Sequence, residues 1–481
     1  MFRKLAAGAL LAAAMSTAAS AQNAATVIAN ATKAMGAEGL TSITYSGTAM
    51  NGNFGQSKTI AGPLAMTNIT AYTRSIDFNQ PASRAFGPTM PPAVPGGPPP
   101  QAGNFNQNIT PANAAWTQQL EIWITPWGFL KGAAANNATV RADRGVNVVS
   151  WMPAQKAPSG QSYRLNGYIN AQNMVERVET WVEHPVVGDL HVDTTYAAYQ
   201  DFGGLKVPTR ITQTRAGIRT FEATLTAATA NPPNITALLT PPPPPQGAPG
   251  GGGGGQQAAA APPAVQSEKL ADGVYRITGG YVALAVEMRD HVVVIEGGQS
   301  EARGLAVIAE TRRVIPNKPI RYVVNTHMHF DHSSGLAPFA AEGIAIVTHE
   351  NNKAFLEKAL GNPRTLAGDA LAKSNRKPVV EAAGDRRTLS DDTHTIELYN
   401  VRNLEHSDGM LAAYLPKEKI LLTADFNVPA PNAPMNPSIP VLQQNVDRLN
   451  LDVASHILVH APNPDRPLNN PELLAIANGA N

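Results

Sequence analysis

His327-Met328-His329-Phe330-Asp331-His332 is the most informative stretch of this chain, because it sets four potential metal ligands within one short loop. The residues before it, Pro319 to Thr326, form an apolar, β-branched run that ends at an Asn-Thr turn signal, which predicts a buried parallel strand. The ligands therefore follow the carboxyl end of a strand, where α/β proteins usually build their sites. Because residues two apart in an extended loop point the same way, the first two histidines can bind one metal while the Asp-His pair reaches a second. Imidazoles and carboxylates suit zinc, with iron or manganese as second choices.

Three further candidate ligands stand where later strands are expected to end. His406 lies in a polar loop between two expected strands. Asp425 follows the apolar run Ile420 to Ala424, and His460 ends a short apolar strand. His456 competes with His460 for the last position, since both side chains face the same side of that strand, but His456 lies deeper within it.

With these positions in order, the second half of the chain resembles the metallo-β-lactamase-fold hydrolases across essentially its whole length. The resemblance implies that the first metal is bound by His327, His329 and His406. It implies that the second metal is bound by Asp331, His332 and His460, with Asp425 bridging both. Two zinc ions about 3.5 to 4 Å apart would share a hydroxide that attacks an acyl carbonyl, and Asp331 would orient the hydroxide and then carry a proton to the leaving group.

The residue at the bridging position narrows the substrate that the resemblance implies. Members that cleave β-lactams typically carry Cys or Ser where this chain has Asp425, whereas thioesterases of the glyoxalase II type, lactonases and other hydrolases carry Asp. We therefore expect a small acyl substrate with an ester, lactone or thioester bond, and a β-lactam is less favoured.

One position departs from the pattern of the resembled family. After the expected strand Val292 to Ile295, the family usually has Asp, a small residue and Gly, whereas this chain has Glu296-Gly297-Gly298. The family's Asp supports the ligands without binding the metal, so the longer Glu bears on fine geometry and not on metal binding itself.

Length and composition predict two domains and a small-molecule partner. At 481 residues the chain is too long for one ordinary domain, and 43% hydrophobic residues are enough to bury more than one core. A formal net charge of +1 gives no large one-sided field, so neither nucleic acid nor an anionic membrane is expected as a partner. Cysteine is absent, which excludes disulfides, thiolate ligands and cysteine nucleophiles. The sequence indicates no oligomeric state.

The N-terminus has the pattern of a secretory signal peptide. Arg3 and Lys4 give a cationic start, an apolar Ala/Leu run follows, and Ala19-Ser20-Ala21 is a small-residue cleavage site. We therefore expect cleavage after residue 21 and a periplasmic or secreted protein. The alternative is an N-terminal membrane anchor, for which the apolar run is short. No transmembrane segment is expected after cleavage, because no other stretch is long enough to cross a bilayer.

A Pro/Gly/Ala-rich stretch, PPPPPQGAPGGGGGGQQAAAAPP from Pro241 to Pro263, separates two parts of the chain. Such a stretch cannot bury apolar surface, so it predicts a disordered linker. The expected organisation is a first domain over residues 22–239, a linker over 240–266 and a second domain over 267–481.

The first domain opens with a helical pattern ended by Gly36 and continues with strand-like runs separated by Pro, Gly and Asp turns. This order predicts a mostly antiparallel, β-rich α+β domain. Together with the segment Gly203 to Ile211, the order resembles periplasmic lipoprotein-carrier-like domains, whose curved sheet holds an acyl chain, and implies a ligand-binding role. His184 and His191 are expected to be surface or hairpin residues.

The second domain alternates strand and helix patterns and holds nine of the eleven histidines. This alternation predicts an α/β fold in which two sheets are covered by outer helices, an αββα sandwich. His291, His349 and His394 stand outside the motif and are expected to be surface or capping residues.

Two other classes of function stay open at this point. The second domain could be a redox di-iron site, although no flavin-binding domain follows it. The protein could also be a non-catalytic periplasmic carrier or binding protein with a structural metal domain. A complete ligand set favours the enzyme over both alternatives.

Overall fold

The computed structural model describes residues 24–60, 62–92, 101–111, 114–241, 264–429 and 435–478. The expected signal peptide and most of the expected linker lie outside these residues. The chain forms two units. The N-terminal unit contains Met1–Phe54, Leu64–Glu183 and Leu190–Ala258, and the C-terminal unit contains Gly55–Pro63, His184–Asp189 and Ala259–Asn481. Two short segments from the first half of the sequence therefore belong to the C-terminal unit.

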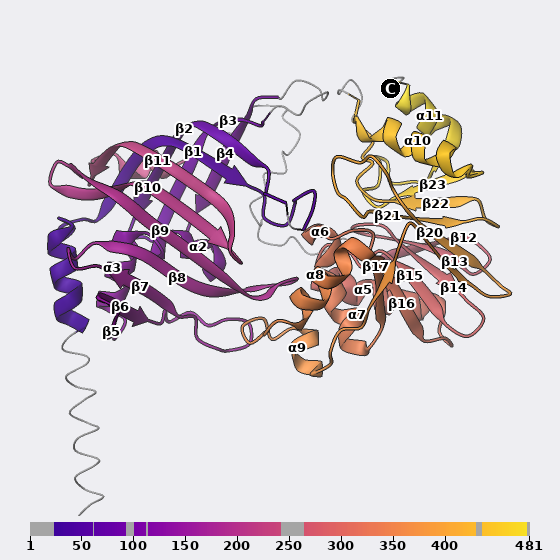
Figure 1. Cartoon of the computed structure of the whole chain (residues 1–481), viewed down its shortest axis with the longest axis horizontal. Helices are drawn as coiled ribbons and strands as arrows, with labels where there is room; N and C mark the ends of the chain where they lie inside the picture. The colour runs from indigo at the N-terminus through magenta and orange to yellow at the C-terminus, as the bar shows by residue number, and fades with distance from the viewer. Residues whose placement is uncertain are drawn as a thin grey trace, which may run out of the picture. The chain divides into compact units, whose positions relative to one another are not determined.

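The N-terminal unit is built on one antiparallel sheet, as expected (Figure 1). A helix over residues 24–34 opens it, and Gly36 follows in the left-handed region with φ +64°. Among the described residues the sheet has eleven strands in the order β4-β3-β2-β1-β11-β10-β9-β8-β7-β6-β5. Their bounds are β1 Ser42–Gly52, β2 Met66–Asp77, β3 Ala82–Met90, β4 Gly103–Ile109, β5 Thr139–Asp143, β6 Val146–Trp151, β7 Leu165–Ile169, β8 Val175–His184, β9 Gly188–Phe202, β10 Leu205–Arg215 and β11 Ile218–Ala230.

Two helices supply large aromatic side chains to the core of this unit. These are α2 (Trp116–Trp123) and α3 (Pro126–Ala135), and a short helix, α4 (Ile235–Leu239), follows the last strand. Trp127 and Phe129 of α3 are fully buried. A Cβ at Gly167 in β7 would lie 2.1 Å from the Phe129 ring, so the close approach of helix and sheet requires glycine there.

The C-terminal unit consists of two sheets with helices outside them, which confirms the expected sandwich. The first sheet has the order β12 (Gln266–Ala271), β13 (Val274–Thr278), β14 (Ala283–Glu287), β15 (Val292–Ile295), β16 (Ile320–Val324), β17 (Ala345–His349) and β18 (Val380–Ala383). The second has the order β19 (Arg386–Ser390), β20 (Thr395–Asn400), β21 (Leu411–Leu415), β22 (Ile420–Thr423), β23 (Ser455–Leu458) and β24 (Leu468–Asn469). The helices are α5 (Glu301–Val314), α6 (Phe330–Ser333), α7 (Leu336–Glu342), α8 (Glu350–Gly361), α9 (Ala370–Ser374), α10 (Ser438–Leu449) and α11 (Asn470–Ala477).

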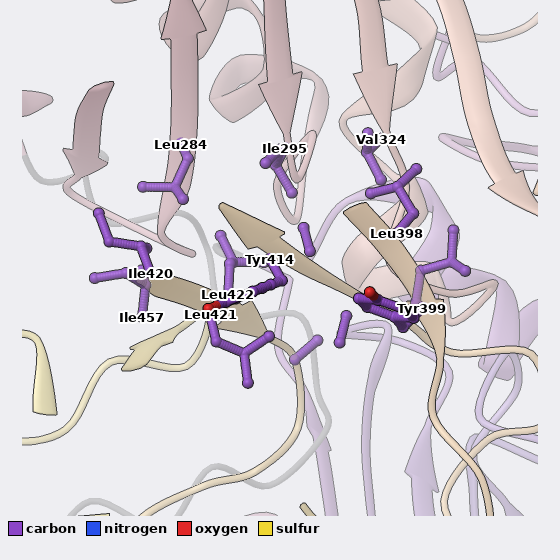
Figure 2. Close-up of a cluster of buried hydrophobic side chains, with 14 of the residues drawn as sticks. Leu284, Ile295, Val324, Leu398, Tyr399, Tyr414, Ile420, Leu421, Leu422 and Ile457 are labelled. Atoms are coloured by element: carbon purple, nitrogen blue, oxygen red, sulfur yellow. The ribbon is translucent and has the colours of Figure 1, made fainter. Parts of the chain in front are cut away.

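Strand β15 shows why the first sheet lies at the centre of this unit. Val293 and Ile295 pack into the core between the two sheets, where Figure 2 shows Ile295. Val292 and Val294 pack against the outer helices. A strand buried on both faces must be apolar at every position, and this explains the continuous run of four β-branched residues. β15 and β16 pair in parallel, so their carboxyl ends lie at one edge of the sheet. Close packing on both faces makes that edge a rigid support for the loops that follow it.

None of the described helices is long and apolar enough to cross a membrane.

Candidate metal centre

The His-rich motif follows the carboxyl end of β16, as the sequence predicts. Asn325 fixes the start of the loop: its backbone N–H donates to Val347 of β17, and its side-chain amide donates to the carbonyl oxygen of His332 at 3.1 Å. The backbone N–H of Leu411, the first residue of β21, donates to the carbonyl oxygen of Thr326 at 2.7 Å. The loop is therefore attached to both sheets before any ligand is considered.

The first group of candidate ligands consists of His327, His329 and His406, whose ligand nitrogens lie within 4.8 Å of one another. The ring centroids of His327 and His329 are 4.5 Å apart, and those of His329 and His406 are also 4.5 Å apart. His327 and His329 are buried, while His406 is partly exposed. The structure thus brings together the three residues assigned to the first metal.

The second group consists of Asp331, His332, Asp425 and His460, whose ligand atoms also lie within 4.8 Å of one another. Nε2 of His332 is 3.2 Å from Nε2 of His460 and 3.4 Å from Oδ2 of Asp331. His332 is fully buried, but the side chain of Asp331 is 31% exposed. All seven residues singled out from the sequence therefore fall into one of the two groups.

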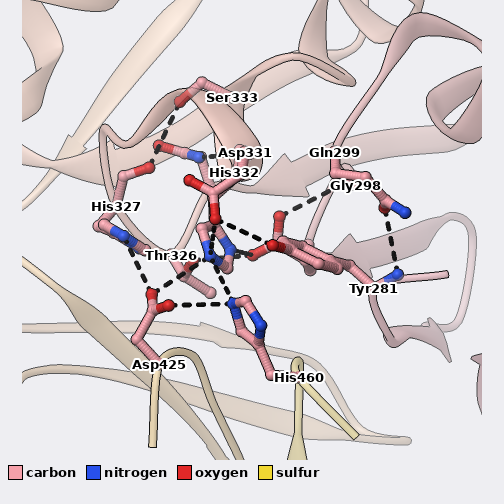
Figure 3. A network of polar contacts seen from close by, with 12 residues as sticks. Tyr281, Gly298, Gln299, Thr326, His327, Asp331, His332, Ser333, Asp425 and His460 are labelled. Atoms are coloured by element: carbon pink, nitrogen blue, oxygen red, sulfur yellow. Dashed lines mark hydrogen bonds and ion pairs between the residues drawn. The ribbon is translucent and has the colours of Figure 1, made fainter. Parts of the chain in front are cut away.

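Asp425 lies between the two groups (Figure 3). Its Oδ2 is 3.1 Å from Nε2 of His327 and 3.5 Å from Nε2 of His406, in the first group. Within the second group, Oδ2 is 3.2 Å from Nε2 of His332 and Oδ1 is 3.0 Å from Nε2 of His460. Its backbone has φ +61°, a conformation that Asp adopts more readily than most residues and that here follows directly after β22.

Burial and charge set the protonation of the candidate ligands. Burial raises the pKa of Asp425, but the close imidazoles of His332, His406 and His460 outweigh it and hold that pKa well below its ordinary value. Burial, with neighbouring histidines, keeps the pKa of His327 well below its ordinary value and lowers that of His329 to about 4. These two imidazoles are therefore neutral at neutral pH, the form that binds metal.

His332 has the opposite electrostatic environment. Burial lowers its pKa, but the carboxylates of Glu296 and Asp425 outweigh burial and raise the pKa to about 10. The same carboxylates would attract a metal cation, which would take the place of the proton on the ring.

The unpaired atoms of the cluster fit a metal ion. Among the described residues, no hydrogen-bond partner was found for four buried atoms: Nε2 of His327, Nδ1 of His329, Nε2 of His406 and Oδ2 of Asp425. Buried polar atoms are seldom left without partners, because each costs about 1–3 kcal/mol. Three imidazole nitrogens and a carboxylate oxygen in one place are a donor set that zinc takes.

Glu296, the residue that departs from the family pattern, supports the centre from behind. It is fully buried and has φ +77°. Its Oε2 accepts a hydrogen bond from Oγ1 of Thr326 at 2.8 Å and lies 3.3 Å from Nδ1 of His332. The longer side chain thus still reaches a ligand, in the supporting role that the resemblance implies for Asp.

Tyr281 is a site residue that the sequence reasoning missed. Its hydroxyl donates to Oδ2 of Asp331 at 3.0 Å, and its ring lies 4.3 Å from that of His460 and 5.0 Å from that of His332, between centroids. The buried guanidinium of Arg303 fixes the loop that carries Tyr281, since it donates to the carbonyl oxygens of Ile277, Thr278, Gly279 and Tyr281. The one signal in the sequence that could have indicated Tyr281 is its position in the loop between the strands β13 and β14.

The other histidines do not join either group. Nε2 of His456 contacts Oδ1 of Asn470 at 3.2 Å, so His460 and not His456 lies in the cluster. His349 caps α8, where its Nδ1 accepts from the backbone N–H of Asn351. His394, His291 and His191 contact Asp272, Asp290 and Glu179 respectively, and His184 lies in the β8–β9 hairpin with its ring against Phe330.

The C-terminal unit is an αββα sandwich that carries a His/Asp cluster suited to metal, and comparison with known proteins relates this unit to a superfamily. Residues 278–461 match the model of the metallo-beta-lactamase superfamily. The C-terminal unit therefore has the metallo-beta-lactamase fold, with a His/Asp cluster suited to metal. The match leaves the N-terminal unit outside it.

Individual relatives are distant. The chain is 25% identical over 167 residues to the 2,4-dinitroanisole O-demethylase subunit alpha of Nocardioides sp. (strain JS1661), a match that covers 34% of this chain and 46% of that relative. It thus spans less than half of the relative's length. Among solved structures, a metallo-beta-lactamase from Pontibacter korlensis is similar with 18% identity and a TM-score of 0.35, covering 45% of this chain and 98% of that one. The DIM-1 metallo-beta-lactamase is similar with 16% identity and a TM-score of 0.34, covering 46% of this chain and 99% of that one.

Proposed function

We propose that this protein is an exported, metal-dependent hydrolase that cleaves an ester, lactone or thioester bond in a small molecule, with a β-lactam less favoured. One observation carries the proposal: both ligand groups converge on Asp425, whose carboxylate oxygens lie 3.0 to 3.5 Å from nitrogens of four histidines. A carboxylate placed in this way can bind two metal ions at once, which supports a two-metal hydrolytic centre.

The donor atoms support zinc, two ions per chain, with iron or manganese as second choices. The set has five imidazoles and two carboxylates, and the chain contains no cysteine that could add a thiolate. When bound, such ions supply a water acidified to a pKa of about 7 and positive charge for a developing oxyanion.

Asp331 is the residue proposed to move the proton. It is the more exposed carboxylate of the cluster, with 31% of its side chain accessible against 8% for Asp425, so it can reach a bound substrate. Its Oδ2, already a hydrogen-bond acceptor from Tyr281, can accept the proton of the attacking water and then give it to the leaving group. Tyr281 keeps that oxygen oriented, and burial and neighbouring carboxylates raise the pKa of its hydroxyl, so that it stays a donor.

Cleavage of an aryl methyl ether is a second candidate function. The specific observation in its favour is the similarity to a subunit of an enzyme named for O-demethylation of 2,4-dinitroanisole. That compound belongs in the substrate panel, since release of 2,4-dinitrophenolate is visible as a yellow product.

The test combines metal analysis of the purified mature protein with hydrolysis of a lactone, a thioester, an aryl ester, a cephalosporin and 2,4-dinitroanisole. We expect about two zinc ions per chain, as in other two-metal hydrolases, and turnover of at least one acyl substrate. In a His329→Ala, Asp425→Ala double variant, metal and turnover should be lost together.

A matched control is the Asp290→Ala, His291→Ala double variant. These two side chains also form a His–Asp contact, at 2.6 Å, but outside both ligand groups. Metal and turnover should be unchanged in it. A wild-type protein that binds metal but hydrolyses nothing in the panel would favour the non-catalytic carrier instead.

Export is tested separately by cell fractionation and N-terminal sequencing. The mature protein should begin at Gln22 and be found in the periplasm or the medium. A chain that keeps residue 1 and stays with the cytoplasmic fraction would contradict export without bearing on the hydrolase.

A further inference from the structure

Four residues from the β1–β2 connection, the Gly55–Lys58 segment, belong to the C-terminal unit and lie against the metal-binding loops. Gln56 lies 275 positions upstream of Asp331, the motif residue that its side chain contacts. The β1–β2 connection spans residues 53–65 and is much longer than the two to five residues of a common hairpin loop, so joining the two strands does not by itself explain these contacts.

The contacts are made along the whole segment. The carbonyl oxygen of Gly55 accepts from the backbone N–H of Phe330 at 3.3 Å, and that of Lys58 accepts from the backbone N–H of Asp408 at 2.8 Å. Phe330 lies inside the His-rich motif, and Asp408 lies two residues after His406. The segment therefore joins the two loops that hold the first group of ligands.

Ser57 contacts a ligand directly. Its carbonyl oxygen lies 2.9 Å from Nε2 of His329. A carbonyl oxygen can only accept a hydrogen bond, so Nε2 must carry the hydrogen of the neutral ring, and the lone pair is left on Nδ1. That Nδ1 is the buried atom of His329 for which no hydrogen-bond partner was found among the described residues.

Gln56 contacts the second group. Its side-chain Nε2 donates to Oδ1 of Asp331 at 2.6 Å, while Tyr281 donates to Oδ2. The carboxylate is thus held at both oxygens, one of them by the upstream segment.

We propose that the Gly55–Lys58 segment is a positioning element of the metal centre. The Ser57 carbonyl selects the metal-binding tautomer of His329, and the Gln56 amide orients Asp331. The inference rests on the proposed metal-dependent function, but it concerns metal affinity and ligand orientation and not the bond that is cleaved. Outer hydrogen bonds of this kind typically change metal affinity about 10- to 100-fold when they are removed.

Gly55 offers a sharp way to displace the segment. A Cβ at this position would lie 2.1 Å from Cδ2 of Phe330, and the backbone has φ +89°. Gly145, in the N-terminal unit, has the same φ of +89°, and a Cβ placed there would meet no described atom within 4 Å. Gly55→Ala and Gly145→Ala therefore carry the same backbone strain, and only the former pushes the segment away from the motif.

Gln56→Ala is the second variant, because it shortens one side chain and leaves the backbone contacts in place. Its control is Gln443→Ala in α10, where the side-chain amide also donates to a carboxylate, that of Asp447 at 2.7 Å, outside both ligand groups. Both variants therefore remove a Gln–Asp hydrogen bond, and only Gln56→Ala removes one that reaches a candidate ligand.

The experiment measures zinc affinity of the full chain by competition with a chromophoric chelator. We expect affinity to fall at least tenfold in Gly55→Ala and Gln56→Ala and to change less than twofold in Gly145→Ala and Gln443→Ala. In addition, ¹⁵N NMR of the metal-free protein should show His329 as its Nε2–H tautomer, assigned by loss of its signals in His329→Ala, and a shift toward the other tautomer in Gly55→Ala.

Wild-type affinity in both test variants, or an Nδ1–H tautomer of His329 in the wild type, would overturn the proposal. Gln56→Ala decides the result if Gly55→Ala does not fold. Metal binding without hydrolysis would count against the proposed function alone, since affinity and tautomer are measured without substrate.

Discussion

The carboxylate of Glu296 and the imidazole of His332 form a fully buried pair, with Oε2 of Glu296 3.3 Å from Nδ1 of His332. The opposite nitrogen of the same ring faces Asp425 and His460. Glu296 thus fixes which nitrogen of His332 points into the cluster.

Glu296→Gln should weaken metal binding without unfolding the protein. The amide keeps the volume of the side chain but removes its charge, so the Nδ1–H of His332 loses a charged acceptor. We expect metal affinity to fall about 10- to 100-fold. Chelator competition measures the loss, and an unchanged affinity would mean that the charge of Glu296 has no part in metal binding.

Removing the metal should destabilise the C-terminal unit alone. A ligand at 1,000 times its dissociation constant stabilises the folded state by about 4 kcal/mol, which corresponds to roughly 8–16 °C in Tm for a unit of this size. All five tryptophans lie between residues 116 and 181, within the N-terminal unit. Tryptophan fluorescence should therefore report a melting transition that a chelator leaves in place, while circular dichroism shows a second transition that moves down.

The Asp425→Ala variant provides the control for that melting experiment. Asp425 contacts both ligand groups, so the variant should bind no metal. The circular dichroism transition of the variant should therefore not respond to the chelator. A chelator-dependent shift that persists in Asp425→Ala would place the metal elsewhere.

Tyr281→Phe should lower kcat while metal content stays at the wild-type level. The variant removes the donor to Oδ2 of Asp331 and keeps the ring that packs on His460. A hydrogen bond to a charged group is worth about 1.5–3 kcal/mol, so kcat should fall roughly 10- to 100-fold. Steady-state kinetics with the best substrate of the panel measure the change.

Tyr399→Phe is the matched control for this prediction. Its hydroxyl also donates to a carboxylate, that of Glu397 in β20, outside both ligand groups. Equal losses of kcat in the two variants would mean that the effect is structural and not specific to Asp331.

Glu179 makes the stability of the N-terminal unit depend on pH, in a direction that follows from its pKa. Burial raises its pKa, but hydrogen bonds from His191, Tyr168 and Asn166 and the charge of Arg177 outweigh it and lower the pKa to about 2. A depressed pKa contributes stability above the unfolded value of about 4.3, and that stability is lost as the pH falls toward the folded value.

Glu179→Gln should therefore lower the free energy of unfolding at pH 7 and have a much smaller effect near pH 2. Urea denaturation followed by tryptophan fluorescence measures both. Glu222→Gln is the control, because Glu222 forms a surface ion pair with Arg219, whose side chain is 57% exposed, and should cost little at either pH. Equal losses for Glu179→Gln at both pH values would contradict the assignment.

The motif and its strand could be predicted from sequence because the determinants are local. The run before His327 is apolar at each buried position of β16, and β22, the strand before Asp425, is apolar at all of its buried positions except Thr423. Ligands that follow such strands are recognisable in the linear sequence. The antiparallel character of the first domain was predicted from β8 to β11 for the same reason, and these strands alternate buried and exposed positions.

Other parts of the site have no local signal. Gln56 and Ser57 lie in a polar turn whose partners are more than 270 residues away, and no period in the sequence connects them. Strand β12 begins at Gln266, the last residue of the expected linker. It is an edge strand that pairs on one side only, so its residues are mostly polar and give no apolar run that would mark its start. Such features depend on tertiary contacts, which a pattern of hydrophobic residues does not record.

The two ligand groups draw on both sheets: His327 to His332 follow β16 of the first sheet, and Asp425 and His460 follow β22 and β23 of the second. No complete binding site therefore exists until the two sheets have packed against each other. An ion that binds only after this step cannot increase the folding rate. It should act instead on the reverse reaction, so that metal slows unfolding of the C-terminal unit and leaves its folding rate almost unchanged.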